Sequence, residues 1–305
     1  GEFYPFYFDF YNSQILIVDS KGKIILNEIK KVIDDKNLNE NLIPNNLNEN
    51  ETIMDILVFD ENLFISYYKL DNRENENCYK FGIKVGRISE KFIQFDDFFN
   101  SNECGHTIHG GRMQYFNYKD SDGILITISD NKFDYPNMSA QLDDTIFGKI
   151  LFFDFYSNEY IIYSKGHRNA QGLYADKNVI LSTEHGPRGG DEINKILFGE
   201  NYGWPIASYG EKYEINKNSQ QYKKNHSKYN FNEPIYTFIP SIGINEIIKI
   251  ENSFSNKWQN NFLISSLNGR SLFRILFDSK FEKLIYLEKI FIGERIRDLK
   301  FDKIN

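Results

Sequence analysis

Charged and amide side chains gather at both ends of one short apolar run, residues 178–183 (NVILST). His167, Arg168 and Asn169 precede this run, and the stretch EHGPRGGDE at residues 184–192 follows it. A short β-rich run bounded by polar and turn residues predicts a buried strand. Polar groups held at the ends of a rigid strand are typical of a functional site, because loops on a scaffold carry function. The plainer interpretation is a pair of glycine-rich surface turns.

A second pair of arginines lies near the end of the chain. Arg295 and Arg297 are two residues apart in GERIRDL, and on a strand this spacing places both side chains on one face. Arginine binds planar carboxylates through paired hydrogen bonds, so these residues suit a flat anionic ligand. In the alternative interpretation, Arg297 forms a surface ion pair with Asp298 or Glu294.

Two histidines in the stretch GHTIHGGR, His106 and His109, are candidates for a general base. A neutral imidazole near its own pKa suits the removal of a hydroxyl proton. In the alternative interpretation, both histidines line a loop. The five histidines of the chain do not fall in HExxH or similar spacing, which disfavours histidine-rich transition-metal chemistry.

The elements that must position these residues are short apolar runs separated by turns. Groups of such runs recur at roughly 40–55 residues, which predicts a β-propeller whose blades are four-stranded antiparallel sheets. No sustained α-helical period is present. An all-β sandwich is the alternative, although the number of units is high for one.

Length, charge and cysteine content limit the remaining possibilities. Large β architectures often fold as one domain at 305 residues, so a single domain over residues 1–305 is expected. The net charge of −7 gives no overall basic field for nucleic acid or an anionic membrane, and no apolar run approaches the ~18 residues of a membrane span. Cys78 and Cys104 could form one disulfide or remain two small buried hydrophobes.

Three blocks between residues 166 and 210, GHRNAQGL, EHGPRGGDEIN and NYGWP, occur in one order. Together they resemble the soluble quinoprotein sugar dehydrogenases, the PQQ-dependent glucose/sorbosone family. The resemblance implies an all-β fold, a six-bladed β-propeller, that oxidises an aldose to its lactone. It also implies a quinone or other electron acceptor and a periplasmic or secreted location. The chain ends part-way into a sixth unit, so its last blade is either truncated or completed by N-terminal strands.

The same resemblance assigns cofactor and metal contacts. Pyrroloquinoline quinone (PQQ) is a flat ortho-quinone with three carboxylates, and the two matching pairs of cofactor contacts are Arg168 with Asn169 and Arg295 with Arg297.

Calcium accepts backbone carbonyls among six to eight oxygen ligands. By resemblance, Gly186 and Pro187 ligate the calcium that touches PQQ. Glu192 and the Tyr202 carbonyl would ligate a second, structural calcium. Without the resemblance, Asp191 and Glu192 are ordinary turn acids.

Two departures from the family pattern concern catalysis. The family places its histidine in H-x-G-G-R, but a strict count back from Arg112 reaches Ile108. A shift of one residue makes His109 the base, which we favour, and a two-residue insertion makes it His106. Asn268 stands where the family has a lysine, and without a charge it would stabilise a developing oxyanion less well. Both departures fit the alternative of a non-catalytic propeller binding module; a calcium-dependent hydrolase is a weaker third hypothesis.

Overall fold

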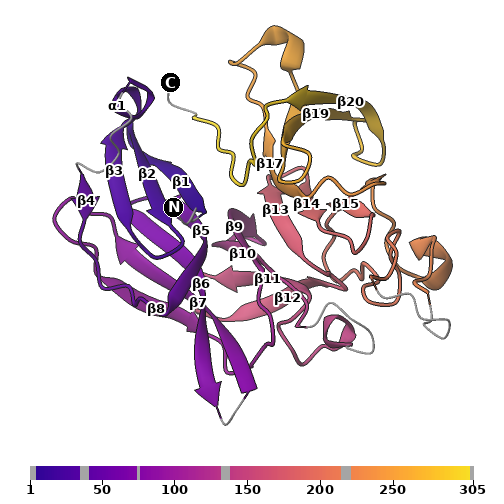
Figure 1. The fold of residues 1–305 in the computed structure, drawn as a ribbon, viewed down its shortest axis with the longest axis horizontal. Coiled ribbons are helices and arrows are strands. Elements are labelled where there is room, and N and C mark those ends of the chain that lie inside the picture. The colour runs from indigo at the N-terminus through magenta and orange to yellow at the C-terminus, as the bar shows by residue number, and fades with distance from the viewer. Residues whose placement is uncertain (1–4, 35–40, 74–75, 132–137, 214–220, 303–305) are drawn as a thin grey trace. The chain divides into compact units, whose positions relative to one another are not determined.

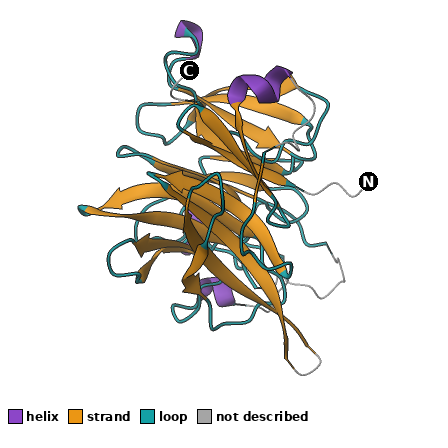
Figure 2. Cartoon of the chain, turned by 90° about the vertical axis from the view of Figure 1, so that its left-hand side faces the viewer, coloured by secondary structure: helices purple, strands orange, loops and turns teal. Residues whose placement is uncertain are grey.

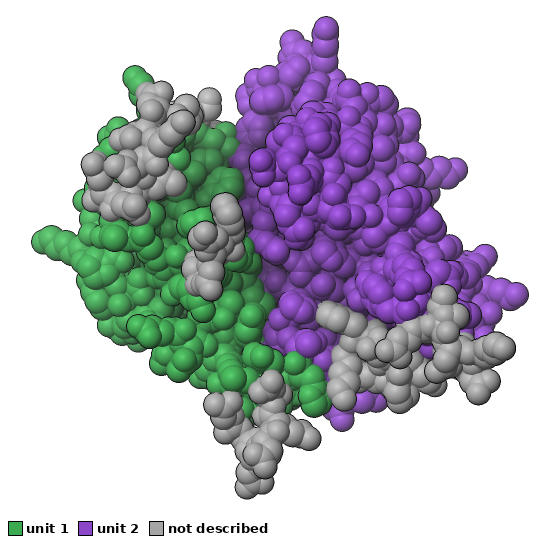
Figure 3. Space-filling view, in the orientation of Figure 1, with its two compact units in different colours: residues 1–106, 302–305 green, residues 107–301 purple. Residues whose placement is uncertain are grey.

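The computed structural model describes residues 5–34, 41–73, 76–131, 138–213 and 221–302. The chain divides into two compact units (Figure 3), unit 1 with residues 1–106 and 302–305 and unit 2 with residues 107–301. Strands dominate both units, and the helices are short (Figure 2).

Unit 1 contains two four-stranded antiparallel sheets, in each of which neighbouring strands follow chain order (Figure 1). The first sheet consists of β1 (Phe6–Tyr11), β2 (Gln14–Asp19), β3 (Ile24–Glu28) and β4 (Leu42–Ile43). The second consists of β5 (Glu51–Phe59), β6 (Asn62–Arg73), β7 (Glu76–Arg87) and β8 (Phe95–Asn100). A short helix, α1 (Ile29–Asp34), follows β3, although the sequence showed no helical period there.

The core of unit 1 forms because both sheets turn alternate apolar side chains toward each other. Leu16, Ile24, Ile56 and Ile65 belong to one buried cluster. Cys78 and Cys104, whose pairing the sequence left open, form a disulfide.

Unit 2 contains three four-stranded antiparallel sheets, again with neighbouring strands in chain order. The first consists of β9 (Gly110–Tyr118), β10 (Ser121–Ile128), β11 (Lys149–Asp154) and β12 (Tyr160–Lys165). The second consists of β13 (Ala170–Ala175), β14 (Ile180–Glu184), β15 (Asp191–Lys195) and β16 (Tyr236–Phe238). The third consists of β17 (Ile244–Lys249), β18 (Asn261–Ser266), β19 (Ser271–Phe277) and β20 (Leu284–Phe291). Three 3₁₀ helices, η1 (Ser139–Gln141), η2 (His226–Tyr229) and η3 (Asn256–Trp258), lie in its loops.

The first strands of the three sheets of unit 2 are neighbours, with β13 packed against both β9 and β17. Apolar clusters fill the spaces between successive sheets, and they include Leu125 with Leu173 and Leu181 with Ile264. The strand predicted in residues 178–183 is β14, which is buried at every residue. Three packed inner strands therefore give the site a rigid support.

The fold is an all-β propeller with four-stranded antiparallel blades, but the prediction of six blades is wrong. The described residues form five. Strands β1 to β4 form the first sheet by themselves. After β20, Gly293 adopts a left-handed φ of 93°, and residues 294–302 form no strand.

The irregular segment at residues 294–302 also bears on the prediction that Arg295 and Arg297 share one strand face. Because the segment is not a strand, the two-residue spacing of Arg295 and Arg297 does not fix both side chains on one sheet face. Arg295 is exposed, whereas Arg297 is partly buried.

Candidate active site

The turn between β12 and β13 holds Arg168 and Asn169, and the carboxylate of Glu184 fixes it. Glu184 Oε1 accepts hydrogen bonds from the backbone amides of Arg168 and Asn169, the latter at 3.3 Å. Glu184 Oε2 lies 3.1 Å from His167 Nδ1, and His167 Nε2 lies 2.8 Å from Ser164 Oγ. A buried carboxylate with this many partners holds the turn in one conformation.

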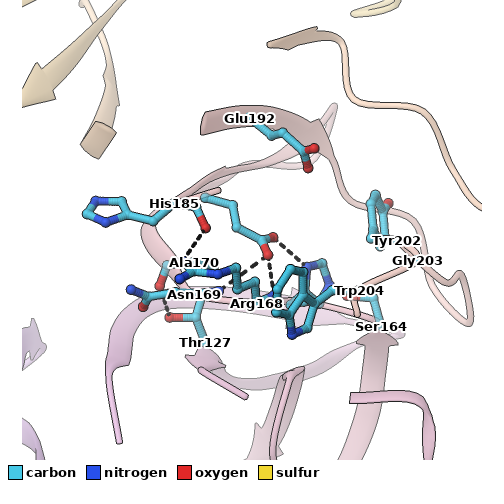
Figure 4. Close-up of polar contacts among 12 residues, drawn as sticks. Thr127, Ser164, Arg168, Asn169, Ala170, His185, Glu192, Tyr202, Gly203 and Trp204 are labelled. Atoms are coloured by element: carbon cyan, nitrogen blue, oxygen red, sulfur yellow. Dashed lines mark hydrogen bonds and ion pairs between the residues drawn. The ribbon is translucent and has the colours of Figure 1, made fainter. Parts of the chain in front are cut away.

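The Arg168 side chain is buried beside an aromatic wall, which the rings of Trp204 and Tyr222 form. Its Nη1 donates to the His185 carbonyl at 2.9 Å, and its guanidinium lies 5.3 Å from the ring centre of Trp204 (Figure 4). Trp204 Nε1 in turn donates to Asp130 Oδ2 at 2.8 Å. Burial lowers the pKa of Arg168, but arginine stays protonated in proteins. The group is therefore a fixed positive charge in a dry setting.

His109 and Arg168 are held by the two residues that directly follow β10, Ser129 and Asp130. Ser129 exchanges two hydrogen bonds with the His109 backbone, at 2.9 and 3.1 Å. The Asp130 amide donates to the Arg168 carbonyl at 2.8 Å. The backbone thus fixes His109 and Arg168 relative to each other.

Of the two candidate bases, His106 and His109, it is His109 that interacts electrostatically with the other site residues. Burial lowers the pKa of its ring, and His185, Arg168 and Arg297 lower that pKa further by electrostatic interaction. By surface area the residue is exposed to solvent, so water screens part of these charge–charge interactions. A neutral imidazole surrounded by positive groups can accept a proton from a substrate and can face an anionic ligand.

His185 is a site residue that the sequence analysis did not single out. Its ring hydrogen-bonds the backbone of Ile244, and burial lowers its pKa. Asp191 holds this region, because its carboxylate accepts from the amides of Gly186 at 3.1 Å and of Ile242 and Ile244 at 3.0 Å each. His185 Nε2 is buried, and no group among the described residues bonds it. Its position directly before Gly186 in EHGP was the available signal.

The turn at Gly186 and Pro187 offers carbonyl oxygens to a cation. Within the described parts of the chain, neither carbonyl accepts a hydrogen bond. A Cβ on Gly186 would lie 2.1 Å from the Gly190 carbonyl oxygen, so only glycine permits this close approach. In the same parts of the chain, no group of three or more His, Cys, Asp or Glu side chains could hold a metal ion. A cation here would depend on backbone oxygens, which calcium accepts.

A small cavity lies between residues that include Glu184 and Glu192. Its volume is about 10 Å³, close to the roughly 10–15 Å³ that one water needs. Ten residues line it: Gly166, Arg168, Glu184, His185, Gly186, Glu192, Tyr202, Trp204, Ala207 and Ser208. Burial raises the pKa of Glu192 well above its ordinary value, and the Glu184 charge raises it further. The Tyr202 carbonyl accepts no hydrogen bond from any described residue. Two acids and a free carbonyl at an ion-sized cavity fit a bound cation.

A larger cavity of about 240 Å³ adjoins the aromatic wall. Its lining includes Tyr222, Lys212 and Lys223. The Tyr222 ring lies 5.3 Å from that of Trp204, on whose ring Arg168 also rests. This cavity gives a small polar molecule room close to the aromatic wall.

The structure brings together only part of the predicted set. His109, Arg168 and Arg297 interact electrostatically, and Asn169 is buried beside Arg168. Arg295 and Asn268 are exposed, and the Asn268 amide donates to the Ile242 carbonyl at 3.0 Å. Among the described residues, no contact joins either of these two side chains to His109, Arg168 or Arg297.

Comparison with known proteins identifies the family of the chain. The family model described as glucose/sorbosone dehydrogenase matches residues 4–303. Aldose sugar dehydrogenase YliI of Escherichia coli is 31% identical over 143 residues, which are 46% of this chain and 38% of that protein. Quinoprotein glucose dehydrogenase B of Acinetobacter calcoaceticus is 52% identical over 50 residues, 16% of this chain and 10% of that protein. These alignments span less than half the length of each curated relative.

Solved structures share the fold. A glucose dehydrogenase aligns with a TM-score of 0.80 and 22% identity, covering 96% of this chain and 89% of that one. The apo-form of the soluble aldose sugar dehydrogenase from Escherichia coli aligns at 0.75 and 21%, covering 97% and 89%. The PQQ-bound aldose sugar dehydrogenase from Streptomyces coelicolor aligns at 0.63 and 19%, covering 93% and 80%. Because the family model matches almost the whole sequence, the chain belongs to the glucose/sorbosone dehydrogenase family.

Proposed function

We propose that this protein is a quinoprotein that oxidises an aldose at C1 to the lactone, with PQQ as cofactor and calcium as metal. The observation that carries the proposal is that Ser129 and Asp130 hold His109 and Arg168 together, and that His109 interacts electrostatically with Arg168, His185 and Arg297. A neutral base next to fixed positive charges suits proton removal beside an anionic redox group. Family membership supports the same chemistry.

The donor set fits PQQ. Arg168 and Arg297 supply positive charge for carboxylates, and Asn169 supplies an amide close to them. His185 Nε2 is a buried polar atom that no described residue bonds, so a bound ligand could satisfy it. When bound, the quinone would supply a two-electron acceptor and the calcium a Lewis acid beside it.

His109 would accept the proton of the C1 hydroxyl as hydride leaves C1. Its lowered pKa keeps the imidazole neutral and ready to accept a proton at neutral pH. Arg168 and Asn169 would orient the cofactor, and Glu184 would hold both residues in place through their backbone amides. Trp204 covers one face of Arg168 and excludes water from it.

The cations would occupy two places. The Gly186 and Pro187 carbonyls would ligate the one that contacts the cofactor. Glu192 and the Tyr202 carbonyl would hold the second in the 10 Å³ cavity, where its charge would offset that of Glu192 and Glu184.

The setting would be periplasmic or secreted, and a quinone or another acceptor would take the electrons. The Cys78–Cys104 disulfide supports an oxidising compartment. No described helix is long and apolar enough to cross a membrane.

The test is a titration of calcium-loaded protein with PQQ, followed by reduction of a redox dye with a panel of aldoses. Saturable binding with sugar-dependent dye reduction is the expected result. Binding without turnover would favour the non-catalytic binding module, with the uncharged Asn268 as one reason. No binding would exclude the cofactor assignment.

A further inference from the structure

The segment that carries Arg297 has no regular secondary structure to place it. β20 ends at Phe291, and residues 294–302 form neither strand nor helix. One backbone contact, from the Ile296 amide to the Ser266 carbonyl, measures 3.3 Å, long for a hydrogen bond. The location of Arg297 must therefore depend on other contacts of this segment.

Arg112 on β9 supplies such contacts. It is only 1% exposed. Its Nη2 donates to the Arg297 carbonyl at 2.8 Å and to Asn245 Oδ1 at 3.1 Å. Its Nε donates to the Gln171 carbonyl at 2.8 Å. One guanidinium thus joins the irregular segment to β9, β13 and β17.

Two carboxylates accompany the buried charge. Arg112 Nη1 lies 3.2 Å from Glu246 Oε2 and 3.6 Å from Asp298 Oδ1, and both acids are buried. Two consecutive residues of the segment, Arg297 through its carbonyl and Asp298 through its carboxylate, therefore contact the same guanidinium. Charge-assisted contacts of this kind fix geometry more strongly than neutral ones.

The same guanidinium is close in sequence to the other site residues. Arg112 follows His109 by three residues, and Gln171 follows Asn169 by two. The segments that carry His109, Asn169 and Arg297 consequently meet at one buried side chain.

We infer that Arg112 is a positioning residue, which sets the location of Arg297 at the candidate site without touching the bound ligand. The identity of that ligand rests on the proposed function, but the positioning role does not. Lysine could keep the charge near Glu246, but it is a point charge on a flexible stem and lacks the fixed fork that reaches several acceptors at once. Arg112→Lys therefore separates the positioning role from the buried charge.

The first test needs no cofactor. Hydrogen exchange is measured in the unliganded full chain, with Arg274→Lys as the matched control. Arg274 lies on β19 and pairs with Glu288 at 2.8 Å. We expect Arg112→Lys to speed exchange of the amides in residues 294–299, and Arg274→Lys to leave it unchanged. Unchanged exchange of this segment in correctly folded Arg112→Lys would overturn the inference.

The second test is a double-mutant cycle on PQQ affinity with Arg112→Lys and Arg297→Ala. If Arg112 acts through Arg297, Arg112→Lys weakens binding roughly tenfold when Arg297 is present and causes little further loss in Arg297→Ala. Equal fold-losses in both backgrounds would show a general structural role and contradict the inference.

The two tests separate this inference from the proposed function. If the wild type binds no PQQ, the cofactor assignment fails, and exchange of residues 294–299 still decides the role of Arg112. If Arg112→Lys does not fold, Asp298→Asn replaces it, because this change removes one contact of the segment and keeps the Arg112–Glu246 pair. Faster exchange in Asp298→Asn would support the inference, and unchanged exchange would contradict it.

Discussion

Glu184 Oε2 and His167 Nδ1 lie 3.1 Å apart, although the two residues are 17 positions apart in the sequence. With Ser164 Oγ 2.8 Å from His167 Nε2, the three side chains have the connectivity of a nucleophile, a base and an orienting acid. Ser164 is 1% exposed and His167 is fully buried, so no substrate can reach the hydroxyl. The arrangement instead supports the turn that carries Arg168, and it offers no accessible serine nucleophile.

Replacement of His109 tests the choice of base. We expect His109→Gln to lower kcat by roughly 10²–10⁴-fold, the usual contribution of general base catalysis, and to leave PQQ affinity nearly unchanged. His106→Gln is the matched control, because His106 belongs to unit 1, whereas His109 interacts with Arg168 and Arg297 of unit 2. Steady-state kinetics with a saturating aldose would measure both. A larger loss in His106→Gln would reverse the assignment.

The pH dependence of kcat/KM should reflect the lowered pKa of His109. Since the neutral ring is the active form, activity should persist as pH falls below the ordinary histidine pKa of about 6.5 and be lost at lower pH. His185, Arg168 and Arg297 face this ring. Arg297→Gln removes one positive neighbour and should move the His109 titration, followed by NMR, toward higher pH. A movement toward lower pH would contradict this electrostatic assignment.

Arg168 should determine cofactor affinity. Arg168→Lys loses the planar contact with Trp204 and part of the hydrogen bonding, so PQQ should bind roughly tenfold to a hundredfold more weakly. Arg87→Lys is the matched control at an exposed ion pair with Glu61. Equilibrium titration would compare the two, and equal affinities would remove Arg168 from the site.

Calcium should stabilise the protein through Glu192. Calcium at a hundred times its Kd should raise the unfolding free energy of the wild type by about 2.7 kcal/mol. Glu192→Gln should lose this gain while remaining at least as stable without calcium, because the neutral amide avoids the cost of ionising a buried carboxyl beside Glu184. Asp143→Asn, at an exposed pair with Lys165, is the control. A full calcium response in Glu192→Gln would place the cation elsewhere.

The disulfide should stabilise unit 1. Cys78 and Cys104 are 26 residues apart, and a loop of this length corresponds to about 3.5 kcal/mol in the chain-entropy treatment. Chemical denaturation of the double serine variant should show a loss of this order, and reductant should have the same effect on the wild type. Identical unfolding curves would show that the bond adds no stability.

Part of this structure could be predicted from the sequence. The strand at residues 178–183 and the all-β fold follow from local patterns, because short apolar runs and turn residues act within a few positions. Gly186 could also be identified as a tight turn from its sequence context. These features depend on near neighbours in the chain.

Other features depend on contacts between distant segments. The number of blades was inferred from resemblance, and five rather than six are present in the described chain. Arg295 was expected to share a face with Arg297, but the segment is held by Arg112 rather than by a strand ladder. The roles of Glu184 and His185 also arise from pairings across β13, β14 and β17, which no local pattern shows.

The most direct test of the proposed function is a single-turnover experiment on calcium-loaded protein carrying stoichiometric PQQ. An aldose is mixed with this protein in the absence of any external electron acceptor, and the absorbance of the bound quinone is followed. We expect one equivalent of quinone to be reduced with one equivalent of lactone formed, and this reduction to be slowed by His109→Gln. Bound quinone that stays oxidised with every aldose, while the Arg168-dependent affinity is intact, would contradict the enzymatic function and leave a binding protein.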